Sequence, residues 1–176
     1  MLNLPNLITM GRILLIPLFI IVFWSPVSYN IQWSMLVLAV AGISDILDGY
    51  LARKLGMITD LGKVLDPLAD KLMVITALVA LFLTNMMPLW LVILIIIKEI
   101  MLVLGSFFIV VRHRSDIVSA NIYGKSATLA VYLAIFAQSF NLPLRHVLTY
   151  IAGLAAIIAF VNYLMLFIRS RKSSPL

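Results

Sequence analysis

Six runs of mostly apolar residues, separated by short polar breaks, organise the chain. They fall at about residues 7–25, 33–54, 67–84, 88–111, 122–139 and 146–168. Each run is close to the roughly 20 residues with which an α-helix crosses a bilayer. Backbone polar groups in lipid need partners within the protein, so runs of this length predict helices rather than barrel strands. The pattern therefore predicts an all-α integral membrane protein with six transmembrane helices.

The breaks between the runs contain residues that end or start helices. They include Ser25-Pro26, the pair Asn85 and Pro88, and the stretch Asn141-Leu142-Pro143. Proline has no backbone N–H group and is accepted best in the first turn of a helix. Pro88 is therefore predicted to lie at the start of the fourth helix.

The composition leaves no room for a water-facing surface. Of the 176 residues, 64% are hydrophobic and 11% are charged, whereas soluble domains average about half apolar and about a quarter charged. The length fits one membrane domain over residues 1–176. The absence of cysteine excludes disulfides, thiolate metal sites and a cysteine nucleophile. The N-terminus has no basic region ahead of its apolar run, so we expect a retained helix rather than a signal peptide.

Basic residues gather at one set of helix ends, which predicts the orientation in the membrane. That set consists of Arg12, Arg53, Lys54, Lys63, Lys71, Arg112, Arg114, Lys125, Arg169, Arg171 and Lys172. The opposite set holds only Arg145, so both termini of this multi-pass chain are predicted to be cytoplasmic, in the cell (inner or plasma) membrane. Arg12 and Lys71 lie slightly inside their runs and are expected to extend outward to water. The scattered basic residues of a chain with net charge +6 suit anionic lipid headgroups, and no nucleic acid partner is expected.

Acidic residues are concentrated in one short stretch. Five of the seven lie within residues 44–71: Asp45, Asp48, Asp60, Asp66 and Asp70. Asp45 and Asp48 are three residues apart, which places them on one helix face. Gly49 and Ala52 fall on the same face at about 100° per residue. Such small residues let a ligand or another backbone approach closely.

A second pair of carboxylates belongs to the third predicted helix. Asp66 and Asp70 are four residues apart and share a face. Pro67 is predicted to lie in the first turn, which makes Asp66 the N-cap, and Gly62 extends this line toward the loop. The short connection at about residues 55–62 makes the second and third helices antiparallel neighbours. Both pairs then face one active-site cavity within the membrane, open to the cytoplasm.

Four carboxylates in one intramembrane cavity need compensating charge. An aspartate at the centre of a membrane helix costs about 2.5–3.5 kcal/mol, and like charges repel or take up protons. Two divalent cations would cancel four negative charges, and oxygen-only ligands favour Mg²⁺ or Mn²⁺ over Zn²⁺. Two such ions commonly clamp a phosphate during its displacement. The residues alone leave an alternative open, in which the carboxylates pair with basic residues or form a cation or proton pathway, as in a small transporter.

The full acidic pattern resembles the signature of the CDP-alcohol phosphatidyltransferases. It consists of Asp45-x-x-Asp48-Gly49-x-x-Ala52-Arg53, eight further residues, and Gly62-x-x-x-Asp66-x-x-x-Asp70, and all eight signature positions match. The opening Asn3-Leu4-Pro5-Asn6, with Thr9, Arg12 and Ile16-Pro17, is similar to phosphatidylglycerophosphate synthases and the related cardiolipin synthases. The resemblance covers essentially the whole chain.

This resemblance implies an enzyme of phospholipid synthesis and assigns roles to the signature residues. An alcohol would attack the β-phosphate of CDP-diacylglycerol and release CMP, with Asp70 as the base that deprotonates the hydroxyl. The implied ligands of two divalent metal ions, Mg²⁺ or Mn²⁺, are Asp45, Asp48, Asp66 and Asp70. The implied contacts of the cytidine and pyrophosphate are Asp45, Gly49, Ala52, Arg53 and Gly62. The family also implies a homodimer.

Glycerol 3-phosphate is the expected acceptor. Its dianionic phosphate would need basic side chains near the site, and the chain has a cluster of them. Arg112, Arg114 and Lys125 lie at one cytoplasmic level, and Gly124-Lys125 resembles a Gly-Lys pair of the synthases. Positive-inside bias explains the same residues equally well. Phosphatidylglycerol, the acceptor of cardiolipin synthases, and another polyol phosphate therefore stay open as alternatives.

Lys98 and Glu99 form an adjacent charged pair near the middle of the fourth run. They stand where phosphatidylglycerophosphate synthases commonly carry Arg-Glu. Adjacent residues do not face each other on a helix, so each is expected to pair elsewhere, within the bundle or across a dimer interface.

Overall fold

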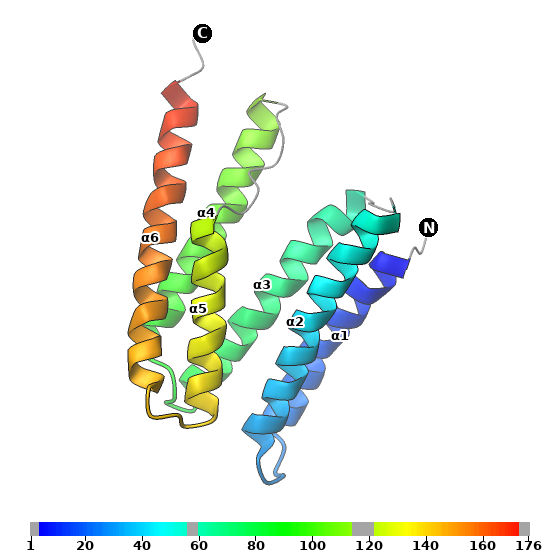
Figure 1. Ribbon diagram of the computed structural model, residues 1–176, viewed down its shortest axis with the longest axis vertical. Helices are drawn as coiled ribbons and strands as arrows, with labels where there is room; N and C mark the ends of the chain where they lie inside the picture. Colours follow the sequence, from blue (N-terminus) through cyan, green and yellow to red (C-terminus); the bar gives the residue numbers. More distant parts are fainter. Residues whose placement is uncertain (1–3, 56–59, 114–121, 173–176) are drawn as a thin grey trace. The chain divides into compact units, whose positions relative to one another are not determined.

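A computed structural model gives the chain as a series of helices. It describes residues 4–55, 60–113 and 122–172, and the side chains of residues 10–45, 68–102 and 122–165. Within these ranges there are six helices and no strand (Figure 1). They are α1 (Leu4–Phe23), α2 (Asn30–Leu55), α3 (Asp60–Leu83), α4 (Leu89–His113), α5 (Ile122–Ser139) and α6 (Arg145–Lys172). The prediction of an all-α chain with six helices is confirmed.

The start of α3 differs from the prediction. The helix begins at Asp60, so Asp66 and Pro67 both lie inside it and the prediction that Asp66 is the N-cap is wrong. A proline inside a helix removes one backbone hydrogen bond, and neighbouring helices make this tolerable in membrane proteins. The longer helix carries Gly62, Asp66 and Asp70 on one continuous element.

Asparagines end two of the helices in the left-handed conformation. Asn85 and Asn141 have φ angles of 58° and 56°, a conformation that asparagine accepts more readily than most residues. After α5, the N–H of Asn141 bonds to the carbonyl of Gln138 at 3.1 Å, and the N–H of Leu142 bonds to that of Ala137 at 2.9 Å. This is the Schellman arrangement, which satisfies the last carbonyls of a helix. The predicted break at Asn141 therefore has a backbone cause.

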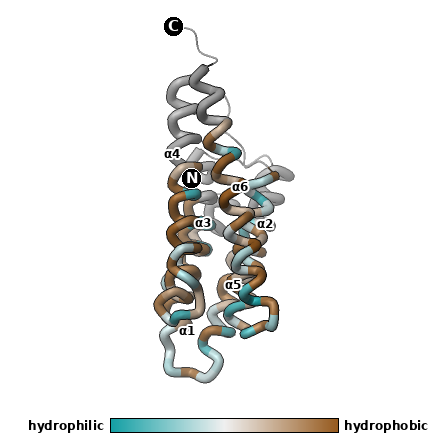
Figure 2. The backbone as a smooth tube through the Cα atoms, turned by 90° about the vertical axis from the view of Figure 1, so that its left-hand side faces the viewer, coloured by the Kyte–Doolittle hydropathy of each residue, from teal (hydrophilic) through white to brown (hydrophobic). Residues whose placement is uncertain are grey.

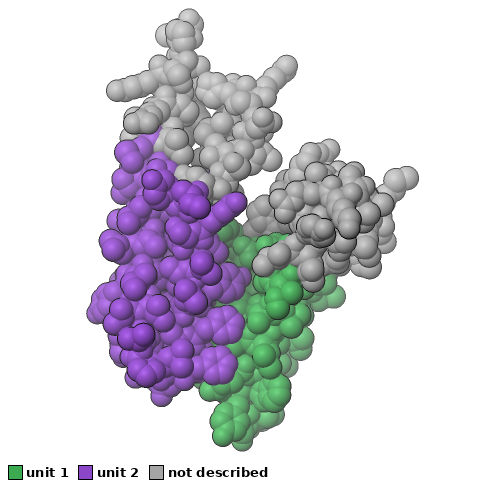
Figure 3. All heavy atoms as spheres, viewed as in Figure 1, with its two compact units in different colours: residues 1–84 green, residues 85–176 purple. Residues whose placement is uncertain are grey.

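The chain divides into two compact units, residues 1–84 and residues 85–176 (Figure 3). In unit 1, α1 packs against α2 and α3, and α2 packs against α3. Its core is made by large apolar side chains with little or no exposure. They include Phe19, Phe23, Met35, Leu38, Met73, Leu78 and Leu81. The helices α2 and α3 are antiparallel neighbours, as predicted (Figure 1).

In unit 2, α6 packs against both α4 and α5. The helices α5 and α6 carry several small buried residues: Ala127, Ala134, Ala152, Ala156 and Ala159. Small residues let helix backbones approach closely, which is the usual packing mode of membrane helices. A buried hydrogen bond from Gln138 Nε2 to Thr149 Oγ1, 3.0 Å long, also joins α5 to α6.

Large apolar side chains are exposed on both units. Examples with more than three-fifths exposure are Leu14, Ile21, Leu129 and Leu154. Hydrophobic residues run along the described helices, while the turn after α1 is more hydrophilic (Figure 2). By length and composition, Arg145–Met165 is the one segment with described side chains that is long and apolar enough to cross a membrane, and Met10–Phe23 is a shorter apolar stretch. Six transmembrane spans stay a prediction.

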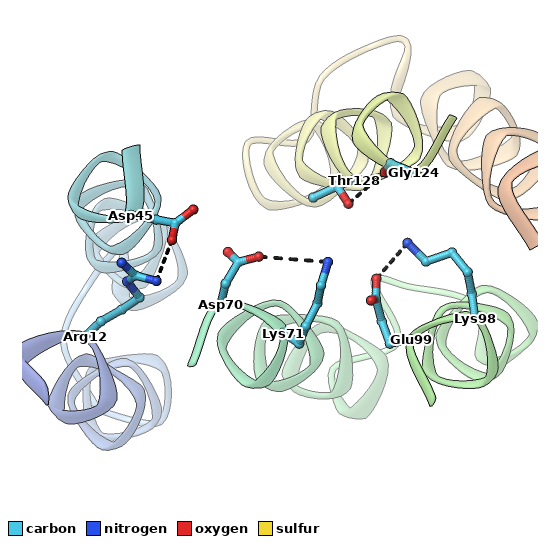
Figure 4. A network of polar contacts seen from close by, with 8 residues as sticks. All are labelled: Arg12, Asp45, Asp70, Lys71, Lys98, Glu99, Gly124 and Thr128. Atoms are coloured by element: carbon cyan, nitrogen blue, oxygen red, sulfur yellow. Dashed lines mark hydrogen bonds and ion pairs between the residues drawn. The ribbon is translucent and has the colours of Figure 1, made fainter. Parts of the chain in front are cut away.

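Lys98 and Glu99 contact each other, so the expectation that adjacent residues on this helix would not meet is wrong. Lys98 Nζ lies 2.6 Å from Glu99 Oε1, and the side chains are 2% and 8% exposed. The long lysine side chain bends around the helix toward its neighbour (Figure 4). Neighbouring positions on a helix point in different directions, but four methylene groups span that separation. Burial makes this short contact stronger than it would be in water.

Glu99→Gln should destabilise the protein, because it removes the carboxylate charge that lies 2.6 Å from the buried Lys98 ammonium. Removing one partner of a buried pair costs about 3–5 kcal/mol, whereas replacing both partners is often nearly neutral. Thermal unfolding in detergent micelles should therefore show a large loss for Glu99→Gln. The double variant Lys98→Met/Glu99→Gln should recover most of it. Equal stability of Glu99→Gln and the wild type would contradict a role for this pair in stability.

Candidate active site

The signature residues belong to two neighbouring helices of unit 1. The signature residues of α2 are Asp45, Asp48, Gly49, Ala52 and Arg53, and those of α3 are Gly62, Asp66 and Asp70. The side chains of Asp45 and Asp70 are described. Those of Asp48, Gly49, Ala52, Arg53, Gly62 and Asp66 lie outside the described side chains, so their predicted roles stay predictions.

Asp45 and Asp70 lie at the same level of the α2–α3 pair. Asp45 is ten residues before Leu55, the last residue of α2, and Asp70 is ten residues after Asp60, the first residue of α3. At 1.5 Å per residue, each is about 15 Å along its helix from the connection. Because the helices are antiparallel, equal axial distances bring the two positions side by side.

The two described carboxylates also point toward each other in the close-up view (Figure 4). Asp45 extends from α2 toward α3, and Asp70 extends from the side of α3 that faces it. The Asp45 side chain is 40% exposed and that of Asp70 is 21% exposed. Both carboxylates are therefore partly shielded by protein and still open to a ligand.

An arginine from α1 completes this side of the site. Arg12 Nη1 donates a hydrogen bond to Oδ1 of Asp45 at 2.6 Å, and the Arg12 side chain is 1% exposed. The prediction that Arg12 extends outward to water is therefore wrong. The sequence did contain a signal: Arg12 is the only charged residue in residues 1–44. An isolated charge within an apolar run requires a partner, and a carboxylate of the next helix supplies it.

Lys71 lies farther from Asp70 than Arg12 lies from Asp45. Its Nζ lies 3.9 Å from Asp70 Oδ2, and its side chain is 22% exposed. That distance is too long for a hydrogen bond, and partly exposed pairs of this kind contribute little to stability. The Asp70–Lys71 contact therefore does not hold Asp70 Oδ2 in the way that Arg12 holds Asp45.

The chemistry of these side chains suits hard divalent cations. Carboxylate oxygens are the preferred protein ligands of Mg²⁺ and Mn²⁺. Among the residues with described side chains there is no group of three or more acidic or histidine residues that could hold a metal. That set includes only two of the four predicted ligands, Asp45 and Asp70. The donor type and the orientation of these two fit the predicted ions.

The residues predicted for the acceptor phosphate belong to unit 2. Arg112 is in the last turn of α4, with its side chain outside the described set, and Arg114 lies outside the described residues. Lys125 is exposed near the start of α5. Gly124 is buried there, and a Cβ at this position would come within 1.9 Å of Tyr163 Oη of α6. Glycine is therefore required for this close approach, whatever Lys125 binds.

Comparison with known proteins decides the family. The pattern of the CDP-alcohol phosphatidyltransferase family matches residues 2–165, which span both units. The chain belongs to the CDP-alcohol phosphatidyltransferase family. It is therefore an enzyme, and the resemblance based on the signature is confirmed.

Named relatives of this phosphatidyltransferase fall into two branches. A CDP-diacylglycerol–glycerol-3-phosphate 3-phosphatidyltransferase from Bacillus subtilis (strain 168) is 38% identical over 173 residues, 90% of this chain and 88% of the relative. One of the same name from Haemophilus influenzae is 34% identical over 92% of this chain and 91% of its own. A cardiolipin synthase (CMP-forming) from Streptomyces coelicolor is 39% identical over 76% of this chain and 63% of its own.

The convergence of the two described carboxylates can be tested by cross-linking. The chain has no native cysteine, so Asp45→Cys/Asp70→Cys introduces one reactive pair. A short bifunctional maleimide should link α2 to α3, which would be detected after cleavage at a protease site inserted at residues 56–59. Ile43→Cys/Asp70→Cys is the control, because Ile43 is 57% exposed and lies about 200° around the helix from Asp45. Equal linking of both pairs, or of neither, would contradict the convergence.

Proposed function

We propose that the protein is a CDP-diacylglycerol–glycerol-3-phosphate 3-phosphatidyltransferase, which makes phosphatidylglycerophosphate and releases CMP. The observation that carries this proposal is the similarity, over about nine-tenths of the chain, to relatives of that name. The complete signature and the antiparallel pair of helices that carries it support the same chemistry. We assign Arg112, Arg114 and Lys125 to the acceptor phosphate on the basis of charge.

The proposed reaction is one displacement at phosphorus. The acceptor hydroxyl oxygen attacks the β-phosphorus of CDP-diacylglycerol and forms a new P–O bond. The bond from that phosphorus to the oxygen of CMP breaks, and its electron pair leaves with CMP. Asp70 accepts the proton of the hydroxyl, which requires a carboxylate within about 2.6–3.2 Å of it. The 21% exposure of Asp70 leaves its carboxylate accessible to such a substrate.

Asp45, Asp48, Asp66 and Asp70 are the proposed ligands of two divalent cations, Mg²⁺ or Mn²⁺. When bound, such ions neutralise charge on the transferring phosphoryl group and on the leaving group. Gly49, Ala52 and Gly62 leave space beside the carboxylates for the cytidine and the pyrophosphate. Arg53, at the loop end of α2, is the proposed contact of a phosphate oxygen because its guanidinium suits phosphate geometry.

The proposed environment is the cell membrane. The composition of 64% hydrophobic residues and the exposed apolar side chains of both units support a protein embedded in lipid. In this arrangement the chain is multi-pass, with six transmembrane spans and both termini cytoplasmic, and it works as a homodimer. A lipid-linked donor explains why the site belongs in the membrane, since its acyl chains stay in the bilayer.

A cardiolipin synthase that uses phosphatidylglycerol is the second candidate within the family, favoured by the Streptomyces coelicolor relative. We prefer glycerol 3-phosphate because the Bacillus subtilis and Haemophilus influenzae relatives of that branch match 88% and 91% of their own length, against 63% for the cardiolipin synthase. A cation or proton transporter built on the same carboxylates is the candidate from another class, and family membership counts against it.

Release of CMP separates these candidates. Purified protein with CDP-diacylglycerol, Mg²⁺ or Mn²⁺ and glycerol 3-phosphate should release CMP. The lipid product should be phosphatidylglycerophosphate, a phosphodiester that keeps the terminal phosphomonoester of the acceptor. Chelation should abolish release, because the diphosphate then faces uncompensated carboxylates. Release with phosphatidylglycerol and not glycerol 3-phosphate would move the protein to the cardiolipin branch. No release with any alcohol would reject the enzymatic proposal.

Asp70→Asn should abolish turnover while much of the nucleotide binding remains. The amide keeps a carbonyl oxygen as a ligand but cannot accept the proton, and loss of a general base costs about 10²–10⁴-fold in rate. Asp60→Asn is the matched control, because Asp60 is an acidic residue of the same helix outside the signature. Turnover and CDP-diacylglycerol affinity should be measured for both. Near-normal turnover of Asp70→Asn would refute the assigned role.

A further inference from the structure

Arg12 holds one particular oxygen of a signature aspartate. The hydrogen bond from Arg12 Nη1 to Asp45 Oδ1 is 2.6 Å long, at the short end for a charge-assisted bond. It joins α1 to α2 inside unit 1 (Figure 4). The arginine side chain is 1% exposed, whereas the Asp45 side chain is 40% exposed. Asp45 is thus bound by a buried arginine, while part of its own side chain remains accessible.

The buried position of Arg12 makes this contact persistent. If Asp45 turned away to meet a ligand, the guanidinium would lose a short charged hydrogen bond in a place that water scarcely reaches. Removing a charged partner from a buried charge is unfavourable. Asp45 is therefore expected to keep Oδ1 on Arg12 whether or not a ligand is present.

We propose that Arg12 is a positioning residue, which fixes Oδ1 of Asp45 so that Oδ2 is presented to a divalent cation. This inference rests on the proposed metal site. Side chains that hold a metal ligand in place contribute about 10- to 100-fold to metal affinity. Arg12 lies on α1, outside the signature stretch of α2 and α3. The packing of α1 beside α2 brings it to Asp45.

Arg12 also adjusts the charge of the site. Four carboxylates and two divalent cations are neutral together, and Arg12 adds one positive charge beside them. A net positive site favours the anionic diphosphate of the donor. The same charge repels a cation, so orientation and repulsion act in opposite directions on metal affinity. The short bond and the burial of Arg12 favour orientation as the larger effect.

Manganese binding separates the two effects without an activity measurement. Mn²⁺ is titrated into the full chain in detergent micelles, and free Mn²⁺ is followed by electron paramagnetic resonance. Arg12→Met should weaken binding about 10- to 100-fold. Arg12→Lys, which keeps the charge and one donor, should fall between Arg12→Met and the wild type. Arg145→Met is the matched control, because it removes one positive charge from unit 2, and should bind like the wild type.

A double-mutant cycle connects the effect to Asp45. In an Asp45→Asn background, Arg12→Met should cause little further loss of Mn²⁺ affinity. A full further loss would mean that Arg12 acts through the fold and would overturn the proposal. Arg12→Met with unchanged or tighter binding would overturn it as well. If Arg12→Met is not recovered folded, Arg12→Lys serves for the same comparison. A wild type without saturable Mn²⁺ binding would overturn the metal site and this inference together.

Discussion

The compensation of carboxylate charge inside apolar helices is the constraint on which the first unit depends. Asp45 and Asp70 stand at matching levels of two antiparallel helices, where two negative charges need opposing charge nearby. Arg12 supplies part of it through a 2.6 Å bond to Asp45. Asp48 and Asp66 belong to the same two helices. In the proposed site, divalent cations would supply the positive charge that Arg12 does not.

This constraint connects the fold to the proposed chemistry. The packing of α1, α2 and α3 against one another positions the two helices that carry the acidic residues. A diphosphate bound by cations needs a fixed array of oxygen ligands, because electrostatic stabilisation depends on groups that are already oriented. The family supplies the reaction class. The signature gives no information on the choice between glycerol 3-phosphate and phosphatidylglycerol.

The sequence predicted the features that depend on periodicity and local chemistry. The six helices followed from apolar runs, the breaks at Asn85 and Asn141 from polar residues and prolines between those runs, and the α2–α3 pairing from a short connection. Features that depend on tertiary packing were missed. The start of α3 at Asp60 could not be predicted, because the cost of Pro67 inside a helix depends on its neighbours. The Lys98–Glu99 contact was missed because adjacent residues on a helix point in different directions. That rule does not account for the length and flexibility of the lysine side chain. The partner of Arg12 required knowing that α1 packs beside α2.

The most direct measurement of the central claim is the location of manganese by anomalous diffraction from crystals grown with Mn²⁺ and CDP-diacylglycerol. The account predicts two peaks about 3.5–4 Å apart, between α2 and α3, within coordination distance of Asp45, Asp48, Asp66 and Asp70. Arg12 should still contact Oδ1 of Asp45. Signature carboxylates that point away from one another, with no manganese between them, would contradict the account.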